Sequence, residues 1–208
     1  MPNKKTVVQT NKTPGSIKEV HLNAVTFAEL WANYPSGNPY DNSTYENQCA
    51  IRMSVTLHRV GIGMKSFSEK LIHPMNGGKL GRILLDGEPT ATRADEMGQW
   101  LKLQPFAGLP KPEDVTGANW EARVKGRTGI IQFSRYWTRE GEGAANASGG
   151  HIDLWNGSRL TISSAPDALA TIGRRFGITS FRQGAAIASN ISWSDLAGSK
   201  SISFWEIK

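Results

Sequence analysis

The chain has 208 residues, of which 38% are hydrophobic, and a formal net charge of +6. This length suits one domain, or one domain with an extension, and its apolar content can fill a single core. The single cysteine excludes an internal disulfide, the absence of any run of about 20 apolar residues excludes a membrane-spanning helix, and the positive charge favours an anionic partner.

Residues 1–20 are predicted to be a basic, flexible N-terminal extension without regular structure. Four lysines precede Glu19, the first acidic residue: Lys4, Lys5, Lys12 and Lys18. Such a cluster is more typical of a solvated tail than of a binding site. The segment lacks the apolar stretch of a secretory signal, so we expect synthesis in the cytoplasm without a signal peptide. Residues 21–208 are then expected to form a single domain.

Two helices are predicted next. Thr26 and Glu29 have the spacing of a capping box, and Pro35 ends the short helix that they begin. After a loop, Asn47 is the predicted N-cap of a longer helix that ends near Gly61. Its apolar residues recur at helical spacing: Ala50, Met53 and Leu57.

Cys49 lies in the first turn of that second helix. Unpaired backbone N–H groups and the positive end of the helix dipole stabilise a thiolate at this position. The position therefore suits a nucleophile. The alternative is structural, because free cysteines are among the residues most often buried in protein cores.

The middle of the chain predicts two further helices and the first strand of the domain. Thr92 is the expected N-cap of one helix, and Val115–Val124 is the other, beyond the proline-rich linker Pro105–Pro112. Gly129–Phe133 is a predicted strand.

The segment that begins at His151 predicts a strand followed by a tight Asn-Gly turn. Alternation along it places His151, Asp153 and Trp155 on one face. A cysteine on a helix followed by a histidine on a strand is the chain order of papain-like thiol enzymes, in which the imidazole is the general base. We expect surface or structural roles for the other histidines: His21, His58 and His73.

The last part of the chain predicts a helix from Ser164 through Ile172 and a final strand at Ser201–Ile207. Helices followed mainly by strands indicate an α+β fold, with the helices packed against one side of an antiparallel sheet. One cysteine and scattered histidines lack the spacing of a zinc site, so we expect no metal and no cofactor.

Five segments, in the same order along the chain, are similar to those of a known family. They are Phe27–Pro35, Glu46–Ser54 (ENQCAIRMS), Gly129–Phe133, His151–Thr161 (HIDLWNGSRLT) and Phe204–Lys208. Together they resemble the family 4 amidase effectors of bacterial type VI secretion. The segments around Cys49 and His151 are the most specific of the five.

This resemblance implies a papain-like fold of the NlpC peptidoglycan endopeptidase type. It also implies an antibacterial enzyme, delivered to the periplasm of rival Gram-negative cells, that cuts the peptidoglycan peptide stem between γ-D-glutamate and meso-diaminopimelate. The implied partners are that stem, a cognate immunity protein and the type VI secretion machinery, with no nucleic acid and no membrane insertion. Carried across, Cys49 is the nucleophile and His151 is the base.

The third catalytic residue has two candidates. In many relatives of the wider fold the residue that orients the histidine lies about a dozen positions later, on the next strand. That region is Thr161–Ser164 in this chain and contains no carboxylate. Asp153 is preferred over Asp167 because side chains at i and i+2 of a strand are neighbours. Asp153 could equally brace the Asn-Gly turn or a nearby loop.

Other roles and other functions stay open at this level. The backbone N–H of Cys49, with Gln48 or Asn47, could hold an oxyanion. Trp137 and Trp155 could line a substrate groove, although a buried core position is the default for such aromatic residues. A basic module that binds peptidoglycan or nucleic acid would not need Cys49. Another papain-like thiol protease, or an acyltransferase, would need Cys49 but not the cell-wall substrate.

Overall fold

The computed structural model describes residues 3–9, 13–15, 17–40, 45, 47–74, 78–137, 149–161, 180–181, 191–192 and 196–208. Its elements are β1 (Asn3–Gln9), β2 (Ile17–Asn23), α1 (Phe27–Ala32), α2 (Cys49–Arg59), β3 (Arg82–Leu85), β4 (Glu88–Ala91), α3 (Ala94–Lys102), β5 (Glu113–Asp114), α4 (Trp120–Val124), β6 (Gly129–Trp137), β7 (Gly149–Trp155), β8 (Ser180–Phe181), β9 (Ile191–Ser192), a 3₁₀ helix (Leu196–Gly198) and β10 (Ser201–Glu206). The helix predicted from Ser164 through Ile172 lies outside the described residues.

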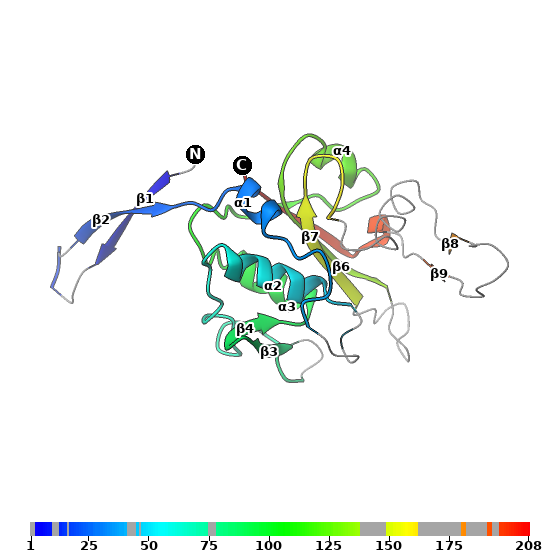
Figure 1. Ribbon diagram of the computed structural model, residues 1–208. Helices are drawn as coiled ribbons and strands as arrows, with labels where there is room; N and C mark the ends of the chain where they lie inside the picture. The colour runs from blue at the N-terminus through cyan, green and yellow to red at the C-terminus, as the bar shows by residue number, and fades with distance from the viewer. Residues whose placement is uncertain are drawn as a thin grey trace.

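A four-stranded antiparallel sheet, in the order β5-β10-β6-β7, is the centre of the molecule (Figure 1). The C-terminal strand β10 therefore lies inside the sheet, paired with both β5 and β6. Along β10, Phe204 pairs with Ile131 and Trp205 with Ile130. These neighbours point to opposite faces of the sheet, because successive side chains of a strand alternate.

The two faces of the sheet carry separate hydrophobic clusters. Ile130, Ile152 and Trp205 pack with residues of α1, α2 and α3 on one face. Ile131 and Phe204 pack with Trp120 and Val124 of the short helix α4 on the other face. The prediction of an α+β fold with N-terminal helices on an antiparallel sheet is confirmed and is consistent with a papain-like, NlpC-type fold. The expectation that all helices lie on one side is wrong for α4.

The helix starts agree only partly with the sequence predictions. At α1 the capping box is confirmed, since the Thr26 hydroxyl accepts from the Glu29 N–H at 3.3 Å and Glu29 Oε2 accepts from the Thr26 N–H at 2.8 Å. At α2 the N-cap is Gln48, without a side-chain capping bond, and the prediction of Asn47 is wrong. The side-chain amide of Gln48 instead bonds the backbone of Tyr40: its oxygen accepts from the Tyr40 N–H, and its nitrogen donates to the Tyr40 carbonyl.

The start of α3 and the extent of α4 also differ from prediction. Arg93, not Thr92, is the N-cap of α3, and Glu96 in its first turn accepts hydrogen bonds from Gly81 N–H and the Arg93 guanidinium. The helix predicted over Val115–Val124 is confined to α4. Val115 pairs through its N–H with the Ile202 carbonyl instead, which prolongs the contact of the β5 segment with β10.

The N-terminal segment forms a hairpin. Strands β1 and β2 pair antiparallel from Asn3 with Asn23 to Gln9 with Ile17, and the hairpin projects from the body in Figure 1. The prediction of a start without regular structure is wrong, because β-branched residues such as Val7 and Val8 favour a strand despite the neighbouring lysines. The division into a 1–20 extension and a 21–208 domain stays a prediction, and β2 crosses the proposed boundary.

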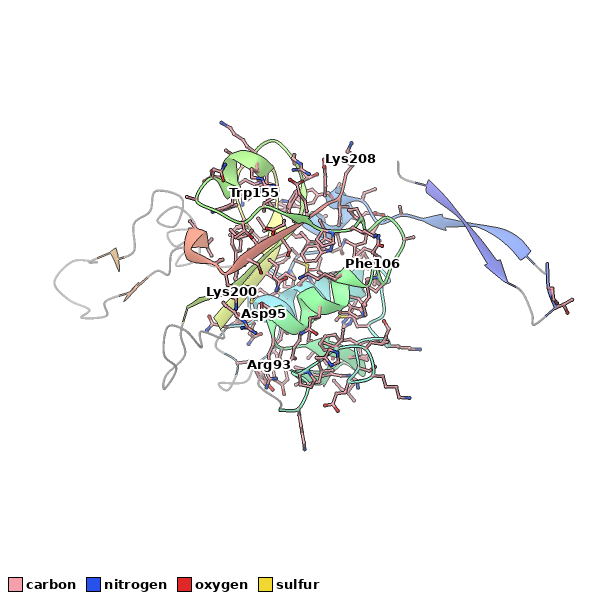
Figure 2. The ribbon with its side chains drawn as sticks, turned by 180° about the vertical axis from the view of Figure 1, so that it is seen from behind. Arg93, Asp95, Phe106, Trp155, Lys200 and Lys208 are labelled. Carbon is pink, nitrogen blue, oxygen red and sulfur yellow. The ribbon has the colours of Figure 1, made fainter. Side chains whose placement is uncertain are left out.

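Helix α3 approaches the sheet closely through Gly98. A Cβ at this position would lie 2.1 Å from Oε1 of Gln132, so only glycine leaves room for the buried Gln132 side chain. Gln132 Nε2 donates to Asp95 Oδ1 at 2.8 Å, and Asp95 lies at the start of α3 in Figure 2. A Cβ on Gly150 would lie 3.0 Å from the same oxygen. These contacts fix α3 against β7 immediately before His151.

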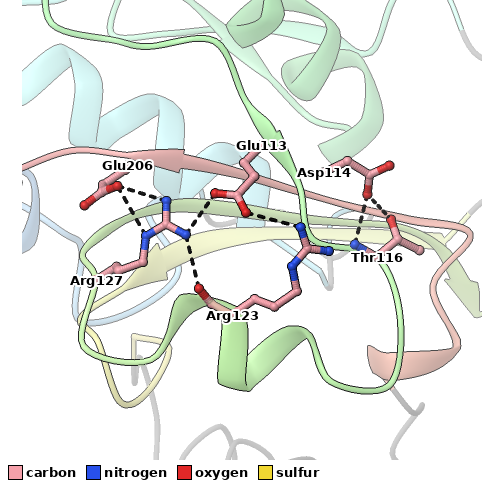
Figure 3. A network of polar contacts seen from close by, with 6 residues as sticks. All are labelled: Glu113, Asp114, Thr116, Arg123, Arg127 and Glu206. Atoms are coloured by element: carbon pink, nitrogen blue, oxygen red, sulfur yellow. Dashed lines mark hydrogen bonds and ion pairs between the residues drawn. The ribbon is translucent and has the colours of Figure 1, made fainter.

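A polar network fastens the opposite edge of the sheet (Figure 3). Arg127 forms ion pairs at 2.9 Å with both Glu113 of β5 and Glu206 of β10, and Arg123 of α4 lies 3.2 Å from Glu113. Each side chain is partly exposed, and such pairs contribute at most about 1 kcal/mol each. The network supports the fold rather than the site on β7.

Among the described residues, no helix is both long and apolar enough to cross a bilayer.

Candidate active site

Cys49 is the first residue of α2, and the N-terminal end of this helix meets β7. The thiol is buried, with 9% of the residue exposed. Its sulfur forms hydrogen bonds with the side chain of His151 and with the backbone of Ile152. The first N–H groups of a helix have no acceptor within the helix, so this end of α2 is electropositive. The predicted position of Cys49 in the first helical turn is confirmed.

His151 lies between Cys49 and Asp153. Its Nε2 is 3.4 Å from Oδ2 of Asp153, and the two side chains are 17% and 5% exposed. The imidazole also stacks on Phe133 of the adjacent strand β6, with ring centroids 6.4 Å apart and planes inclined by 30°. The structure therefore brings Cys49, His151 and Asp153 together, although they come from segments about a hundred residues apart in the chain.

The second carboxylate oxygen of Asp153 is held by two donors. Oδ1 accepts hydrogen bonds from the Leu154 N–H at 2.8 Å and from the Thr161 hydroxyl. The Asn-Gly turn itself is braced by Asn156, whose Oδ1 accepts from the N–H groups of Ser158 and Arg159 at 3.1 and 3.0 Å. Asp153 thus contacts both His151 and the segment that follows the turn. Asp167, the alternative candidate, lies outside the described residues.

The charges of Cys49 and His151 stabilise each other. Burial lowers the pKa of His151, but hydrogen bonds to Asp153 and Cys49 outweigh it and raise that pKa from 6.5 to about 9. Burial raises the pKa of Cys49, but the hydrogen bond and charge of His151 outweigh it and lower that pKa below the ordinary thiol value. A thiolate beside an imidazolium is the state that these opposite shifts favour at neutral pH.

The remaining residues singled out from the sequence lie elsewhere. Trp155 is buried beneath α4, with Nε1 donating to the Val124 carbonyl at 2.9 Å, so it takes the core position that is the default for such a residue and not the alternative place in a groove. The side chains of Trp137 and His21 are not among those described. His58 contacts the Pro89 carbonyl at 3.1 Å, and His73 bonds through its backbone to Gln99. Both contacts are structural, as expected.

The contacts of two residues near the site, Thr161 and Gln48, were not predicted from the sequence. Thr161 follows the Asn-Gly turn and reaches Asp153; its place in the region where relatives carry an orienting residue was the available signal. The side-chain amide of Gln48 bonds the backbone of Tyr40, and the expected help of Gln48 to the Cys49 N–H in holding an oxyanion stays a prediction. Within the described part of the chain, no group of histidine, cysteine and carboxylate side chains, including Cys49, His151 and Asp153, has an arrangement that could hold a metal ion.

A family model described as type VI secretion system (T6SS), amidase effector protein 4 matches residues 45–205, a range that includes Cys49, His151 and Asp153. No curated protein shows a significant match.

Several solved structures are similar to the chain. The type VI effector Tae4 from Enterobacter cloacae is 20% identical, with coverage of 90% of this chain and 99% of that one and a TM-score of 0.48. The Tae4-Tai4 effector-immunity complex from the same organism is 20% identical, with coverage of 88% and 98% and a TM-score of 0.47. The Tae4-Tai4 complex from Salmonella Typhimurium is 20% identical, with coverage of 66% and 86% and a TM-score of 0.44.

Proposed function

Because this chain belongs to the type VI secretion system amidase effector 4 family, we propose that it is a peptidoglycan endopeptidase that acts through a cysteine thiolate. The substrate bond in this proposal joins γ-D-glutamate to meso-diaminopimelate in the peptide stem. The observation that carries the cysteine mechanism is the contact of the buried Cys49 thiol with His151, whose Nε2 lies 3.4 Å from Asp153. Nucleophile, base and orienting group in mutual contact are the arrangement that thiol hydrolysis requires.

In the first half of the reaction the Cys49 thiolate attacks the γ-glutamyl carbonyl carbon. The developing oxyanion lies at the N-terminus of α2, where the Cys49 N–H is a donor. The imidazolium of His151 then gives its proton to the diaminopimelate amine, the C–N bond breaks, and a thioester to Cys49 remains. Since Nε2 of His151 faces Asp153, Nδ1 is the nitrogen that serves the sulfur and the leaving amine.

In the second half a water molecule replaces the departed amine. His151, now neutral, removes a proton from this water, which attacks the thioester carbonyl. Collapse of the second tetrahedral intermediate releases the glutamate carboxyl group and restores the thiolate and the imidazolium. Asp153 stabilises the positive imidazole and keeps its ring in plane with both partners, which is an orienting role.

Partners and location follow from the same family membership. We propose that the enzyme is made in the cytoplasm, loaded on type VI secretion machinery and delivered to the periplasm of a target cell. A cognate immunity protein is the second proposed partner, since a cell that makes this enzyme needs protection from its own kind. The proposed catalytic unit is residues 21–208, with residues 1–20 as an extension.

The bond specificity has a direct test. Purified peptidoglycan from a Gram-negative cell, digested with the wild-type protein, should give stems that end in γ-D-glutamate together with fragments that begin with meso-diaminopimelate. Mass spectrometry of the products distinguishes this cut from cleavage of the crosslink or of the glycan. Fragments from any other bond would overturn the proposed specificity, and unchanged peptidoglycan would favour a binding module.

The proposed site of action is tested by directing the protein to either side of the inner membrane. With an added secretory signal, expression in a Gram-negative host should cause lysis, because the substrate lies only beyond that membrane. Without the signal, cell density should follow that of the empty-vector control. Equal toxicity of the two forms would point to a cytoplasmic target, such as nucleic acid or a cytoplasmic protein, and would contradict the proposal.

A further inference from the structure

The carboxylate of Asp153 is anchored from a segment that lies outside the three proposed catalytic residues. We infer that Thr161 is a positioning residue, which holds Asp153 in the orientation that faces His151, and that Tyr34 holds Thr161 in turn. This inference rests on the proposed roles of Cys49 and His151. It adds two residues, one just beyond α1 and one in the segment after the turn, to which neither family membership nor the sequence assigned a role.

The two carboxylate oxygens of Asp153 have different partners, and this difference supports the inference. Oδ1 accepts from the Leu154 N–H and from the Thr161 hydroxyl, while Oδ2 faces Nε2 of His151. A carboxylate with one oxygen held by two donors cannot rotate without breaking both bonds. Thr161 is only 8% exposed, so water does not readily replace its hydroxyl. Buried hydrogen bonds of this kind are costly to leave unmade.

The turn between β7 and Thr161 is built to return the chain to Asp153. Asn156 caps the turn through its side chain, and Gly157 adopts a φ of +93°, which glycine tolerates best. Trp155 and Leu160 then pair as an antiparallel bridge. Thr161 is the next residue, and its position beside Asp153 follows from this pairing.

Helix α1 and the residues just after it contact the segment that follows the turn, which includes Arg159 and Thr161. The Arg159 guanidinium lies over the Trp31 ring, 5.1 Å from its centroid. The Tyr34 hydroxyl, just beyond α1, forms a hydrogen bond with Thr161. Burial and the nearby charge of Asp153 raise the pKa of Tyr34 well above its ordinary value, so the phenol keeps its proton.

The direction of the hydrogen bonds is fixed by this chemistry. A hydroxyl has one proton to donate and two lone pairs to accept with. Since the Thr161 proton is directed at the carboxylate, Thr161 accepts the proton of Tyr34. The result is a one-way series from Tyr34 through Thr161 and Asp153 to His151, in which each bond polarises the next.

The test removes single hydroxyl groups and measures the ionisation of Cys49 directly. Iodoacetamide reacts with the thiolate, so its rate against pH reports the apparent pKa of Cys49 and needs no substrate. In Thr161→Val the carboxylate loses a donor, the imidazolium loses support, and the pKa of Cys49 should rise. At a pH well below the pKa of Cys49 in both proteins, a rise of one unit in that pKa lowers the alkylation rate about tenfold. Tyr34→Phe should shift the profile the same way by less.

Thr161→Ser and Thr90→Val are the matched variants. Serine keeps the hydroxyl, so Thr161→Ser should recover most of the wild-type profile. Thr90 is a fully buried threonine of β4 whose hydroxyl bonds the Glu88 carbonyl, and Thr90→Val should leave the alkylation profile unchanged. Thermal unfolding of each variant separates loss of folding from loss of positioning. If Thr161→Val does not fold, the Tyr34→Phe and Thr161→Ser profiles decide.

The outcomes separate this inference from the proposed function. If the wild type itself alkylates like an ordinary thiol, the thiolate mechanism is wrong. If the wild type has a lowered thiol pKa and Thr161→Val has the same profile, the positioning role is wrong while the mechanism stands. A Thr161→Ser profile as shifted as that of Thr161→Val would also overturn the inference, because the hydroxyl would then be irrelevant.

Discussion

Replacement of Cys49 by alanine should lower turnover on purified peptidoglycan by at least about three orders of magnitude, the scale of loss when a catalytic nucleophile is removed. The alanine methyl group cannot attack the substrate carbonyl or form the thioester. The measurement is release of stem fragments over time at equal enzyme concentration. Retention of more than about a tenth of wild-type turnover would rule out a thiol nucleophile.

The folding of this variant separates chemistry from structure. Cys49 is a small buried side chain, so its truncation should cost only about 1 kcal/mol in the free energy of unfolding. His151 keeps its contact with Asp153, at 3.4 Å, and no buried charge loses every partner. Ser54→Ala is a suitable control on the same helix: it also truncates a buried side chain, whose hydroxyl donates to the Ala50 carbonyl and accepts from the Ala91 N–H, without touching the sulfur. This control should retain turnover.

His151→Ala should reduce turnover by about two to four orders of magnitude, because both the base and the acid of the reaction are lost. It should also change how activity and alkylation depend on pH. In the wild type the active pair exists above the lowered pKa of Cys49 and below the raised pKa of His151, about 9. Activity should therefore rise with pH through the first value and fall with pH through the second.

In the His151→Ala variant, the pKa of Cys49 should return toward about 8.5, the value of an ordinary thiol. Alkylation by iodoacetamide, fast below neutral pH in the wild type, should then become slow there and recover only in alkali. His58→Gln is the matched control, since His58 lies on the same helix and its ring contacts the Pro89 carbonyl rather than Cys49. Superimposable profiles for wild type and His151→Ala would mean that the two residues do not interact.

The sequence by itself determined the features that depend on neighbours along the chain. The capping box of α1, the first-turn position of Cys49, the buried face of α2 and the strand that carries His151 and Asp153 all follow from periodicity and local hydrogen bonding. The fold class and the identity of the candidate cysteine and histidine were accordingly predictable. Resemblance of the segments around these two residues supplied the family.

Only the tertiary structure decided which groups from distant segments meet. Asn47 and Thr92 are good N-cap residues, yet Gln48 and Arg93 occupy those positions because contacts to Tyr40, Gly81 and Glu96 outweigh local capping. Helix α4 covers the opposite face of the sheet since β5 and β10 pair beneath it.

In the candidate site, too, the contacts between distant segments were decided only by the tertiary structure. Nothing in the order of residues determines that Thr161 reaches Asp153 or that Tyr34 reaches Thr161. These contacts depend on the strand register, on the turn at Gly157 and on the packing of α1 against the returning segment, each of which is fixed only when the whole chain has folded.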